Sequence, residues 1–250
     1  MKQTTAIIVI VVVGLILYLV LLSPQSQIKT GNEDIYNPVV KAENFLGVIN
    51  NPFYTLTPGT TFTYRSETEE GIEKNVVVVT NQAKAILGVK ATVVWDRVWL
   101  DDSLIEETYD WYAQDKEGNV WYFGEDSKEY EDGRVVSTEG SWEAGVDGAK
   151  PGIIMKANPK VGDFYRQEYY KGQAEDAAED AAEVVALMES ITVPTGSYTG
   201  CLKTRDYSYL EPQLNEYKYY CPDVGNMALE VAVESRERAE LIKVENQTSL

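Results

Sequence analysis

The segment from Asp110 to Asp126, which reads DWYAQDKEGNVWYFGED, combines residue types that suit ligand chemistry. Its Trp and Tyr rings suit an aromatic binding surface, and its acidic residues suit a calcium loop. The EF-hand spacing fails, because position 6 counted from Asp115 is Val120, where such a loop requires Gly. Asp115 and Gly118 instead fit the first and fourth positions of a type I turn. We therefore expect a β-hairpin here rather than a calcium site.

Large aromatic rings fall on both faces of this hairpin. Trp111 and Tyr112 are neighbours on one strand and must point to opposite faces, as must Trp121 and Tyr122 on the other. One set of rings is expected to pack in the core, and the other set is free to line a ligand groove. Arginines inside strands of an acidic chain either pair with carboxylates on the surface or line that groove. The candidate ligand-binding residues are Trp95, Trp99, Trp111, Trp121, Arg166 and Arg205.

Histidine is absent from the 250 residues, which excludes Ser-His-Asp triads, Cys-His pairs and every His-ligated metal site. Two cysteines are too few for a closed structural zinc site. The acidic run Gly124–Gly133 offers oxygen ligands, but a solvated turn explains it as well. We predict no metal site and no cofactor. An enzyme would need a carboxylate pair of the kind glycosidases use, and no spacing among the 40 acidic residues selects one.

Cys201 and Cys221 are placed symmetrically about residue 211, which lies in the loop LEPQL. Antiparallel partners keep a constant sum of residue numbers, so the two cysteines can lie directly opposite each other. An oxidising exterior would then favour a disulfide over two separate thiols. The same register pairs two basic residues with tyrosines, in positions that suit cation–π contacts: Lys203 with Tyr219, and Arg205 with Tyr217.

From about residue 46 to residue 246 the chain reads as strands separated by turns, in phrases such as KNVVVVT and KATVVWDRVWL. The strands recur without long helices between them, which predicts an antiparallel sheet. Because many strands need their edges satisfied, we expect a mainly β fold in which a curved sheet forms a closed or half-closed barrel. Ala174–Ser190 is the exception, since it contains AEDA twice. We predict that it forms one short amphipathic helix covering a barrel end.

The N-terminal residues predict a transmembrane helix. The run from Ala6 to Leu22 has 17 residues without a charge, which is about 26 Å as a helix and at the short end of a membrane span. Lys2 favours a cytoplasmic N-terminus, which places the rest of the chain outside the cytoplasm. A cleaved signal peptide is the alternative, but LLSPQSQ offers no small-x-small site. We expect a membrane anchor in residues 1–23, a polar tether in 24–45 and a single antiparallel β domain in 46–246.

The formal net charge of −18 bears on the partners of this domain. Residues 1–30 carry two lysines and no acidic residue, so the negative charge belongs to the predicted β domain. Such a surface repels nucleic acid and anionic lipid headgroups. We therefore exclude nucleic acid as a partner.

Several long phrases resemble a family of exported or membrane-anchored, β-rich prokaryotic proteins of uncharacterised role. They are YDWYAQDKEGNVWYFGED, GSWEAGVDGAKPGIIM, and VPTGSYTGCLKTRDYSYLEP followed by YYCPDVG. The resemblance covers roughly residues 50–245 and implies no catalytic residues. More distantly, TLTPGTTFTY, VPTGSYTGC and PDVGNMALEV are similar to the half-barrels of periplasmic lipoprotein carriers. That likeness implies a concave sheet covered by a helix or loops, and ligand binding by analogy of fold.

These observations lead to one leading interpretation and two alternatives. The leading interpretation is a membrane-anchored, extracytoplasmic β domain that acts as a non-enzymatic binding module, with an amphipathic small molecule or an envelope protein as its partner. The first alternative is a structural or interaction protein of the cell envelope without a small-molecule pocket. The second is a carboxylate-dependent hydrolase, which requires two carboxyl groups about 5–10 Å apart in a cleft.

Overall fold

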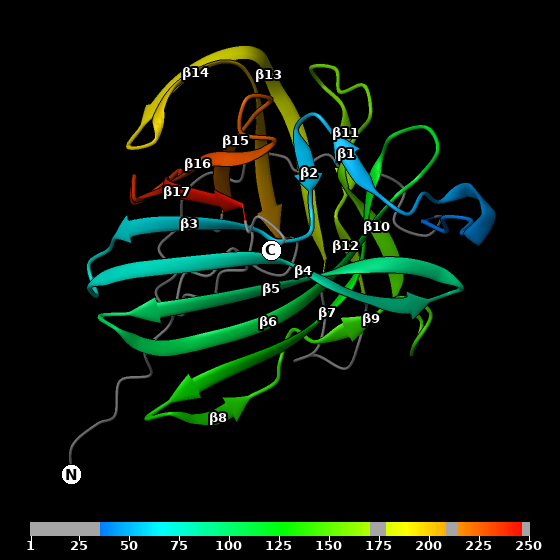
Figure 1. Ribbon diagram of the computed structural model, residues 1–250, viewed down its shortest axis with the longest axis horizontal. Coiled ribbons are helices and arrows are strands. Elements are labelled where there is room, and N and C mark those ends of the chain that lie inside the picture. Colours follow the sequence, from blue (N-terminus) through cyan, green and yellow to red (C-terminus); the bar gives the residue numbers. More distant parts are fainter. Residues whose placement is uncertain (1–35, 171–178, 209–214, 247–250) are drawn as a thin grey trace, which may run out of the picture.

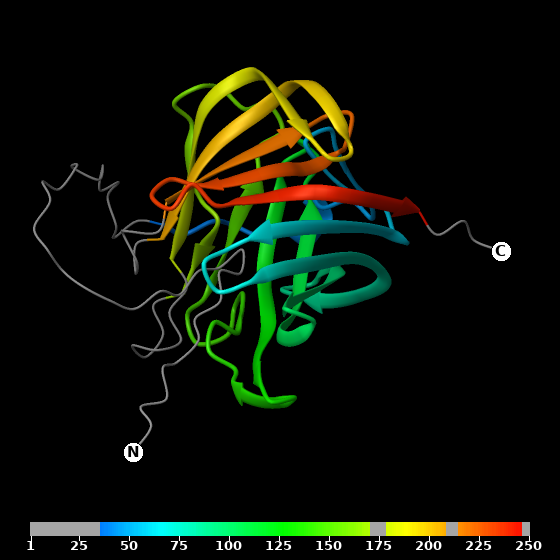
Figure 2. The ribbon, with the colours of Figure 1, turned by 90° about the vertical axis from the view of Figure 1, so that its left-hand side faces the viewer.

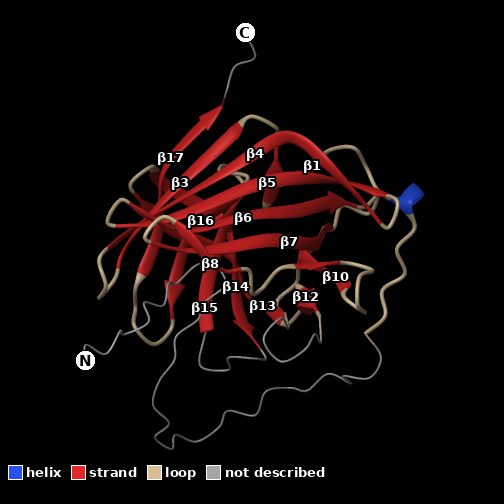
Figure 3. Cartoon of the chain, turned by 90° about the horizontal axis from the view of Figure 1, so that it is seen from below, coloured by secondary structure: helices blue, strands red, loops and turns tan. Residues whose placement is uncertain are grey.

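The computed structural model describes residues 36–170, 179–208 and 215–246. The predicted anchor in residues 1–23 and the first part of the predicted tether lie outside the described residues. Within the described ranges, no helix is long and apolar enough to span a membrane. The only helix among these residues is the short 3-10 turn η2 (Ala42–Asn44), and Figure 3 shows that strands make up the rest of the regular structure.

Two short strands form a separate ribbon, and the others form one large antiparallel sheet. In chain order the strands are β1 (Ile49–Asn51), β2 (Tyr54–Leu56), β3 (Thr60–Glu67), β4 (Ile72–Ile86), β5 (Val89–Leu100), β6 (Ser103–Gln114), β7 (Val120–Glu131), β8 (Arg134–Ser137), β9 (Trp142–Glu143), β10 (Lys150–Met155), β11 (Phe164–Arg166), β12 (Glu168–Tyr169), β13 (Asp180–Val193), β14 (Gly196–Ser208), β15 (Asn215–Cys221), β16 (Asn226–Ala232) and β17 (Arg238–Asn246).

The large sheet curves into a barrel. Its strand order is β11-β13-β14-β15-β16-β17-β3-β4-β5-β6-β7-β10-β12, with β8 and β9 attached to β7. Figure 1 shows β3 to β7 side by side, with β13 and β14 arching over the opposite side of the molecule. In the view of Figure 2, β17 lies along β3, so the last strand of the chain pairs with an early one. The prediction of a mainly β, antiparallel barrel is confirmed.

The two strands at opposite edges of the sheet, β11 and β12, are neighbours in the sequence. β11 (Phe164–Arg166) pairs with β13, and β12 (Glu168–Tyr169), one residue later, pairs with β10. The barrel is therefore nearly closed through the segment 164–169. Gly152 of β10 permits this closure, because a Cβ atom there would lie 2.1 Å from the carbonyl oxygen of Gln167.

The predicted hairpin in Asp110–Asp126 is confirmed, with β6 and β7 as its strands. Asp115 closes the turn, because its Oδ1 accepts hydrogen bonds from the backbone N–H groups of Glu117 (3.0 Å) and Asn119 (2.9 Å). Gly118 has a φ angle of 97°, in the left-handed region that glycine adopts without strain. The carboxylate of Asp115 is thus used by the turn itself.

The predicted helix at Ala174–Ser190 is wrong over the part that the structure describes. From Asp180 onward these residues form β13, which pairs with β11 on one side and β14 on the other. Ala181 and Ala182 are fully buried there, and Ala182 lies opposite Tyr165. Pairing on both sides of β13 outweighs the helix preference of Ala and Glu, which is worth only tenths of a kcal/mol per residue. Residues 174–178 of the predicted helix lie outside the described ranges.

The segment before β1 lies against the barrel wall. The ring of Phe45 is 6.2 Å from that of Trp121 and 5.5 Å from that of Phe123, measured between centroids. Farther upstream, the Tyr36 hydroxyl donates a hydrogen bond to the carbonyl oxygen of Pro151 at 2.7 Å. Tyr36 and Phe45, at the two ends of a segment assigned to the tether from the sequence, therefore contact the β domain.

Cys201 and Cys221 form a disulfide that joins β14 and β15, as predicted. The register is also the predicted one, since Lys203 lies opposite Tyr219. The ammonium of Lys203 is 5.1 Å from the centroid of the Tyr219 ring and 3.8 Å from that of Tyr217. The expected cation–π contact is therefore present at Lys203.

Candidate functional site

The inner face of the barrel is acidic. Tyr64 of β3 marks this face, because its hydroxyl reaches across the intervening strand β17. There it donates a hydrogen bond to the carbonyl oxygen of Met227 on β16 at 2.9 Å. Strand alternation and register place a set of buried or half-buried carboxyl groups on this face. They are Glu73, Asp96, Glu106, Asp110, Glu125, Glu168, Asp180, Asp206, Glu216 and Glu230.

Lys218 of β15 is the buried basic residue among these acids, with 7% of its surface exposed. Its Nζ atom lies 3.6 Å from a carboxylate oxygen of Asp206, 3.6 Å from one of Glu216 and 3.7 Å from one of Glu230. Burial alone would lower the pKa of Lys218, but these carboxylates raise it well above its usual value. The ammonium therefore stays charged, while burial raises the pKa of two acids beside it, Glu216 to about 8 and Glu230 above its usual value.

Several buried polar atoms near this cluster accept or donate no hydrogen bond within the described part of the chain. They include Oδ1 of Asp206 and Oε2 of Glu230, and the hydroxyl groups of Tyr165 and Thr204. All four residues are at most 6% exposed. Leaving such an atom unpaired costs roughly 1–3 kcal/mol, and native structures rarely do so without a ligand, ion or water at the place.

Burial and mutual repulsion raise the pKa of several of the inner carboxyl groups. The pKa of Asp96 is raised to about 8, first by burial and then by the neighbouring charge of Asp110. Burial, followed by the charge of Asp96, likewise raises the pKa of Glu106 to about 8. The pKa values of Glu125 and Glu168 lie well above their usual range, with burial again the main cause. At neutral pH the interior therefore holds protonated acids beside carboxylates, because it lacks the positive charge to ionise them all.

A small cavity lies between β3–β5 and β16–β17. The space open to the centre of a water molecule is about 40 Å³, which is enough for roughly three waters. Carboxylates, an amide and apolar groups line it together, among them Glu73, Glu230, Asn75, Tyr64, Val98 and Met227. Glu230 connects this cavity to the Lys218 cluster, and its Oε2 is one of the atoms without a hydrogen bond.

Tyrosine rings fill the interior beyond the cavity. Tyr122 donates a hydrogen bond to Oδ1 of Asp110 at 2.6 Å and stacks on Tyr112, with ring centroids 4.7 Å apart. Tyr54 meets Tyr112 edge-on at 5.5 Å. Rings and acids thus pack against one another in this part of the interior.

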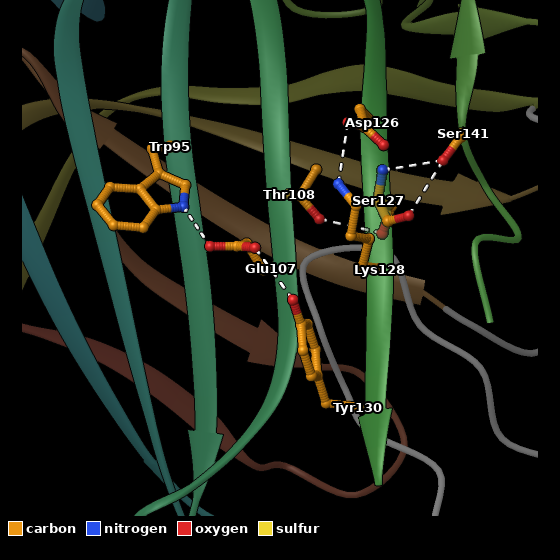
Figure 4. Close-up of polar contacts among 8 residues, drawn as sticks. All are labelled: Trp95, Glu107, Thr108, Asp126, Ser127, Lys128, Tyr130 and Ser141. Carbon is orange, nitrogen blue, oxygen red and sulfur yellow. Dashed lines mark hydrogen bonds and ion pairs between the residues drawn. The ribbon is translucent and has the colours of Figure 1, made fainter. Parts of the chain in front are cut away.

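Trp95 and Trp99, two of the predicted ligand-binding residues, lie on the outer face of β5. The guanidinium of Arg97 lies between them, 3.6 Å from the Trp95 ring centroid and 5.1 Å from that of Trp99. Trp95 also stacks on Tyr109 of β6. Its indole N–H donates a hydrogen bond to Glu107 at 2.9 Å, and Figure 4 shows this contact. These residues form an outward-facing row of stacked rings and cations.

Trp111 and Trp121 lie in a different part of the barrel wall. Trp111 is 6% exposed, and the ammonium of Lys84 is 3.2 Å from the centroid of its ring. Trp121 packs against Phe45 and donates its indole N–H to Oδ2 of Asp115 at 2.8 Å. Both indoles therefore serve the packing of the wall and of the hairpin turn.

Arg166 and Arg205 complete the predicted set. The guanidinium of Arg166 is 5.0 Å from the Tyr169 ring centroid. Arg205 lies opposite Tyr217, in the predicted register, and donates two hydrogen bonds to Oδ1 of Asn215, at 2.8 and 3.2 Å. The six predicted residues are spread over β5, β6, β7, β11 and β14, and they do not converge on one site.

The inner carboxylates were not predicted as site residues, although a signal for them exists. Glu230 stands in the apolar strand phrase ALEVAV, and Asp206 follows a strand phrase that carries Leu202 and Thr204. Acidic residues are depleted in strands, so an acid flanked by apolar residues on a strand points either to a surface or to a functional interior. Whether such an acid lies on the surface or in the interior depends on how strands that are distant in the sequence pair with one another.

No family model matches the chain, and no curated protein matches it. Among solved structures, the chain is similar to the crystal structure of a "putative lipoprotein" from Parabacteroides distasonis ATCC 8503. The two chains are 12% identical, the match covers 77% of this chain and 98% of that chain, and the TM-score is 0.42. A likeness this distant carries no argument about function, so the family suggested by the sequence phrases stays a prediction.

Proposed function

We propose that the protein is a membrane-anchored, extracytoplasmic β-barrel that binds a small polar ligand inside the barrel without converting it. The observation that carries this proposal is Oε2 of Glu230, a buried carboxylate oxygen without a hydrogen bond in a residue that lines a cavity. A ligand with a hydrogen-bond donor would satisfy this atom and recover roughly 1–3 kcal/mol. The small cavity supports a smaller and more polar ligand than the amphipathic molecule expected from the Trp residues.

Two features support a location outside the cytoplasm. The uncharged run Ala6–Leu22 is long enough for a membrane span, and Lys2 precedes it. The disulfide between Cys201 and Cys221 is stable in an oxidising compartment. A location of this kind is tested by adding protease to intact spheroplasts. We expect the barrel to be digested there, whereas digestion only after lysis would contradict the proposed location.

Ligand binding is tested by native mass spectrometry of the gently extracted full-length protein. We expect an added mass that survives chelation and is lost on denaturation. The variant Glu230→Gln should lose most of this mass, while Glu245→Gln, which removes the same charge from an exposed side chain, should keep it. Bare protein in every condition would contradict the binding function.

A second candidate is an envelope interaction protein that binds its partner through the outer row of Trp95, Arg97, Trp99 and Tyr109. The row favours this reading because it presents half-exposed rings and cations on one face, of the kind that is enriched at protein interfaces. Replacing Trp95 and Trp99 by Ala would then abolish partner capture in cross-linking experiments. Binding inside the barrel would be unchanged by the same replacement.

A further inference from the structure

We propose that the ligand of the cavity at Glu230 is a small organic ammonium ion, such as a primary amine with a short alkyl chain. This inference rests on the proposed function, which supplies the site and leaves the chemistry of the ligand open. It follows from the charge of the cavity wall, from the mixture of polar and apolar groups there, and from the way the barrel holds an ammonium group of its own.

The charge of the wall favours a cation. Glu73 and Glu230, both at most 7% exposed, line the cavity with Glu237 and with one guanidinium, that of Arg238, which already forms an ion pair with Glu240. Oε2 of Glu230 accepts no hydrogen bond, and the ammonium of Lys218 is 3.7 Å away from it. A buried carboxylate is stabilised most by a charged donor at hydrogen-bonding distance. Burial raises the pKa of Glu230 although Lys218 opposes the shift, which agrees with a shortage of positive charge around it.

The composition of the wall favours an organic cation over a metal ion. Across the described ranges, no group of three or more acidic or cysteine side chains is arranged to hold a metal, and calcium needs six to eight oxygen ligands. The cavity is lined instead by three carboxylates and one guanidinium, together with apolar groups of Val98 and Met227 and the ring of Tyr64. An alkyl chain can pack on the apolar groups, and a ring face attracts an ammonium.

Lys218 shows how this barrel holds an ammonium group. Its Nζ atom lies within 3.7 Å of three carboxylates contributed by β14, β15 and β16, and its alkyl stem is buried. A ligand amine in the cavity would approach Glu230 from the side of Tyr64 and Met227. Glu230 would then lie between two ammonium groups, and its Oε2 atom, which has an ion pair with Lys218 but no hydrogen bond, would gain a hydrogen-bond donor.

The test is calorimetric titration of the full-length protein with ethylammonium and n-butylammonium chloride, and separately with n-butanol and calcium chloride. We expect saturable binding of one ammonium ion per chain. The neutral alcohol has a similar shape and no charge, so we expect no binding of it at the same concentrations. Calcium should also fail to bind.

Three variants locate the site. Glu230→Gln should weaken ammonium binding by at least about tenfold, which corresponds to loss of one charged hydrogen bond. Ala239→Phe, which fills the cavity without changing its charge, should abolish binding even if Glu230→Gln does not fold. Glu245→Gln should bind as the wild type does, because Glu245 is exposed and forms an ion pair with Lys243 outside the cavity.

The outcomes separate the two proposals. Butanol binding as tightly as butylammonium, or calcium binding in place of either, overturns the ammonium inference and leaves the binding function intact. Ammonium binding that neither Glu230→Gln nor Ala239→Phe weakens also overturns it, because the ion then sits elsewhere. If no probe binds and native mass spectrometry shows bare protein, both the inference and the proposed function are wrong.

Discussion

The ammonium nitrogen of Lys218 lies 3.7 Å from Oε2 of Glu230, and the two residues are directly opposite each other on β15 and β16. The pair is buried, and Asp206 and Glu216 contact the same ammonium from the other sides. Lys218 therefore sets how much negative charge this end of the barrel tolerates. Replacing Lys218 should lower the stability of the fold, because it leaves these buried carboxylates without their counter-charge.

Lys218→Met is expected to lower the free energy of unfolding by about 3–5 kcal/mol at pH 7.5, the usual effect of breaking a buried ion pair. The loss should be smaller at pH 5, since the abandoned carboxyl groups can then take up protons. Urea unfolding at both pH values measures this. Lys243→Met is the control, because the ion pair of Lys243 with Glu245 is exposed and worth little. Equal effects of the two substitutions would contradict the central role of Lys218.

Gly152→Ala tests how the barrel closes. A Cβ atom at this position would lie 2.1 Å from the carbonyl oxygen of Gln167, which is backbone and cannot move aside cheaply. We expect a loss of about 3 kcal/mol in the free energy of unfolding, because β10 and β12 can no longer approach. Gly47→Ala is the matched control, since a Cβ atom there meets nothing within 4 Å. A stable Gly152→Ala variant would mean that the segment 164–169 does not seal the barrel as described.

Much of the fold could be predicted because its signals are local. Alternating β-branched and aromatic residues gave the antiparallel strands, Asp115 and Gly118 gave the hairpin turn, and the spacing of Cys201 and Cys221 gave a register that the structure confirms. The predicted helix failed at Asp180–Ser190 because pairing with strands distant in sequence overrides local preference.

The candidate site was harder to predict, because it depends on which strands meet across the barrel. Asp206, Lys218 and Glu230 come from three successive strands, and Glu73 of β4 lines the cavity beside Glu230. Each looks in the sequence like a surface charge on a strand. The large Trp side chains were predicted to bind the ligand, yet Trp95 faces outward and stacks with Arg97.

The disulfide should contribute measurably to stability. It closes a loop of 20 residues between β14 and β15, and constraining such a loop in the unfolded chain is worth about 3 kcal/mol. We expect the double variant Cys201→Ala/Cys221→Ala to lose that amount in urea unfolding. The intact mass of the exported wild type should lie about 2 Da below that of the reduced chain, one hydrogen being lost from each thiol. Alkylation of both cysteines in the folded, non-reduced protein would contradict the bond.

The stability of the barrel should fall as the pH rises from 5 to 8.5. In the folded state Asp96 and Glu106 have pKa values of about 8, whereas in the unfolded chain carboxyl groups titrate near pH 4. Between these limits the folded state binds more protons than the unfolded state, so its stability is greatest on the acidic side and is lost as the pH rises through 8.

The groups that face Asp96 set the size of this effect. Asp110 raises its pKa further, while the hydrogen bond from Asn75 and the charge of Arg97 lower it. We expect the melting temperature to drop by about 5 °C or more between pH 5 and pH 8.5, since 1 kcal/mol shifts it by about 2–4 °C in a chain of this size. Asp96→Asn should flatten the profile, because the amide does not titrate, whereas the exposed control Glu245→Gln should leave it unchanged. A melting temperature that stays level or rises over this range would show that the inner acids are already ionised at pH 5, and the shortage of positive charge inside the barrel would then not exist.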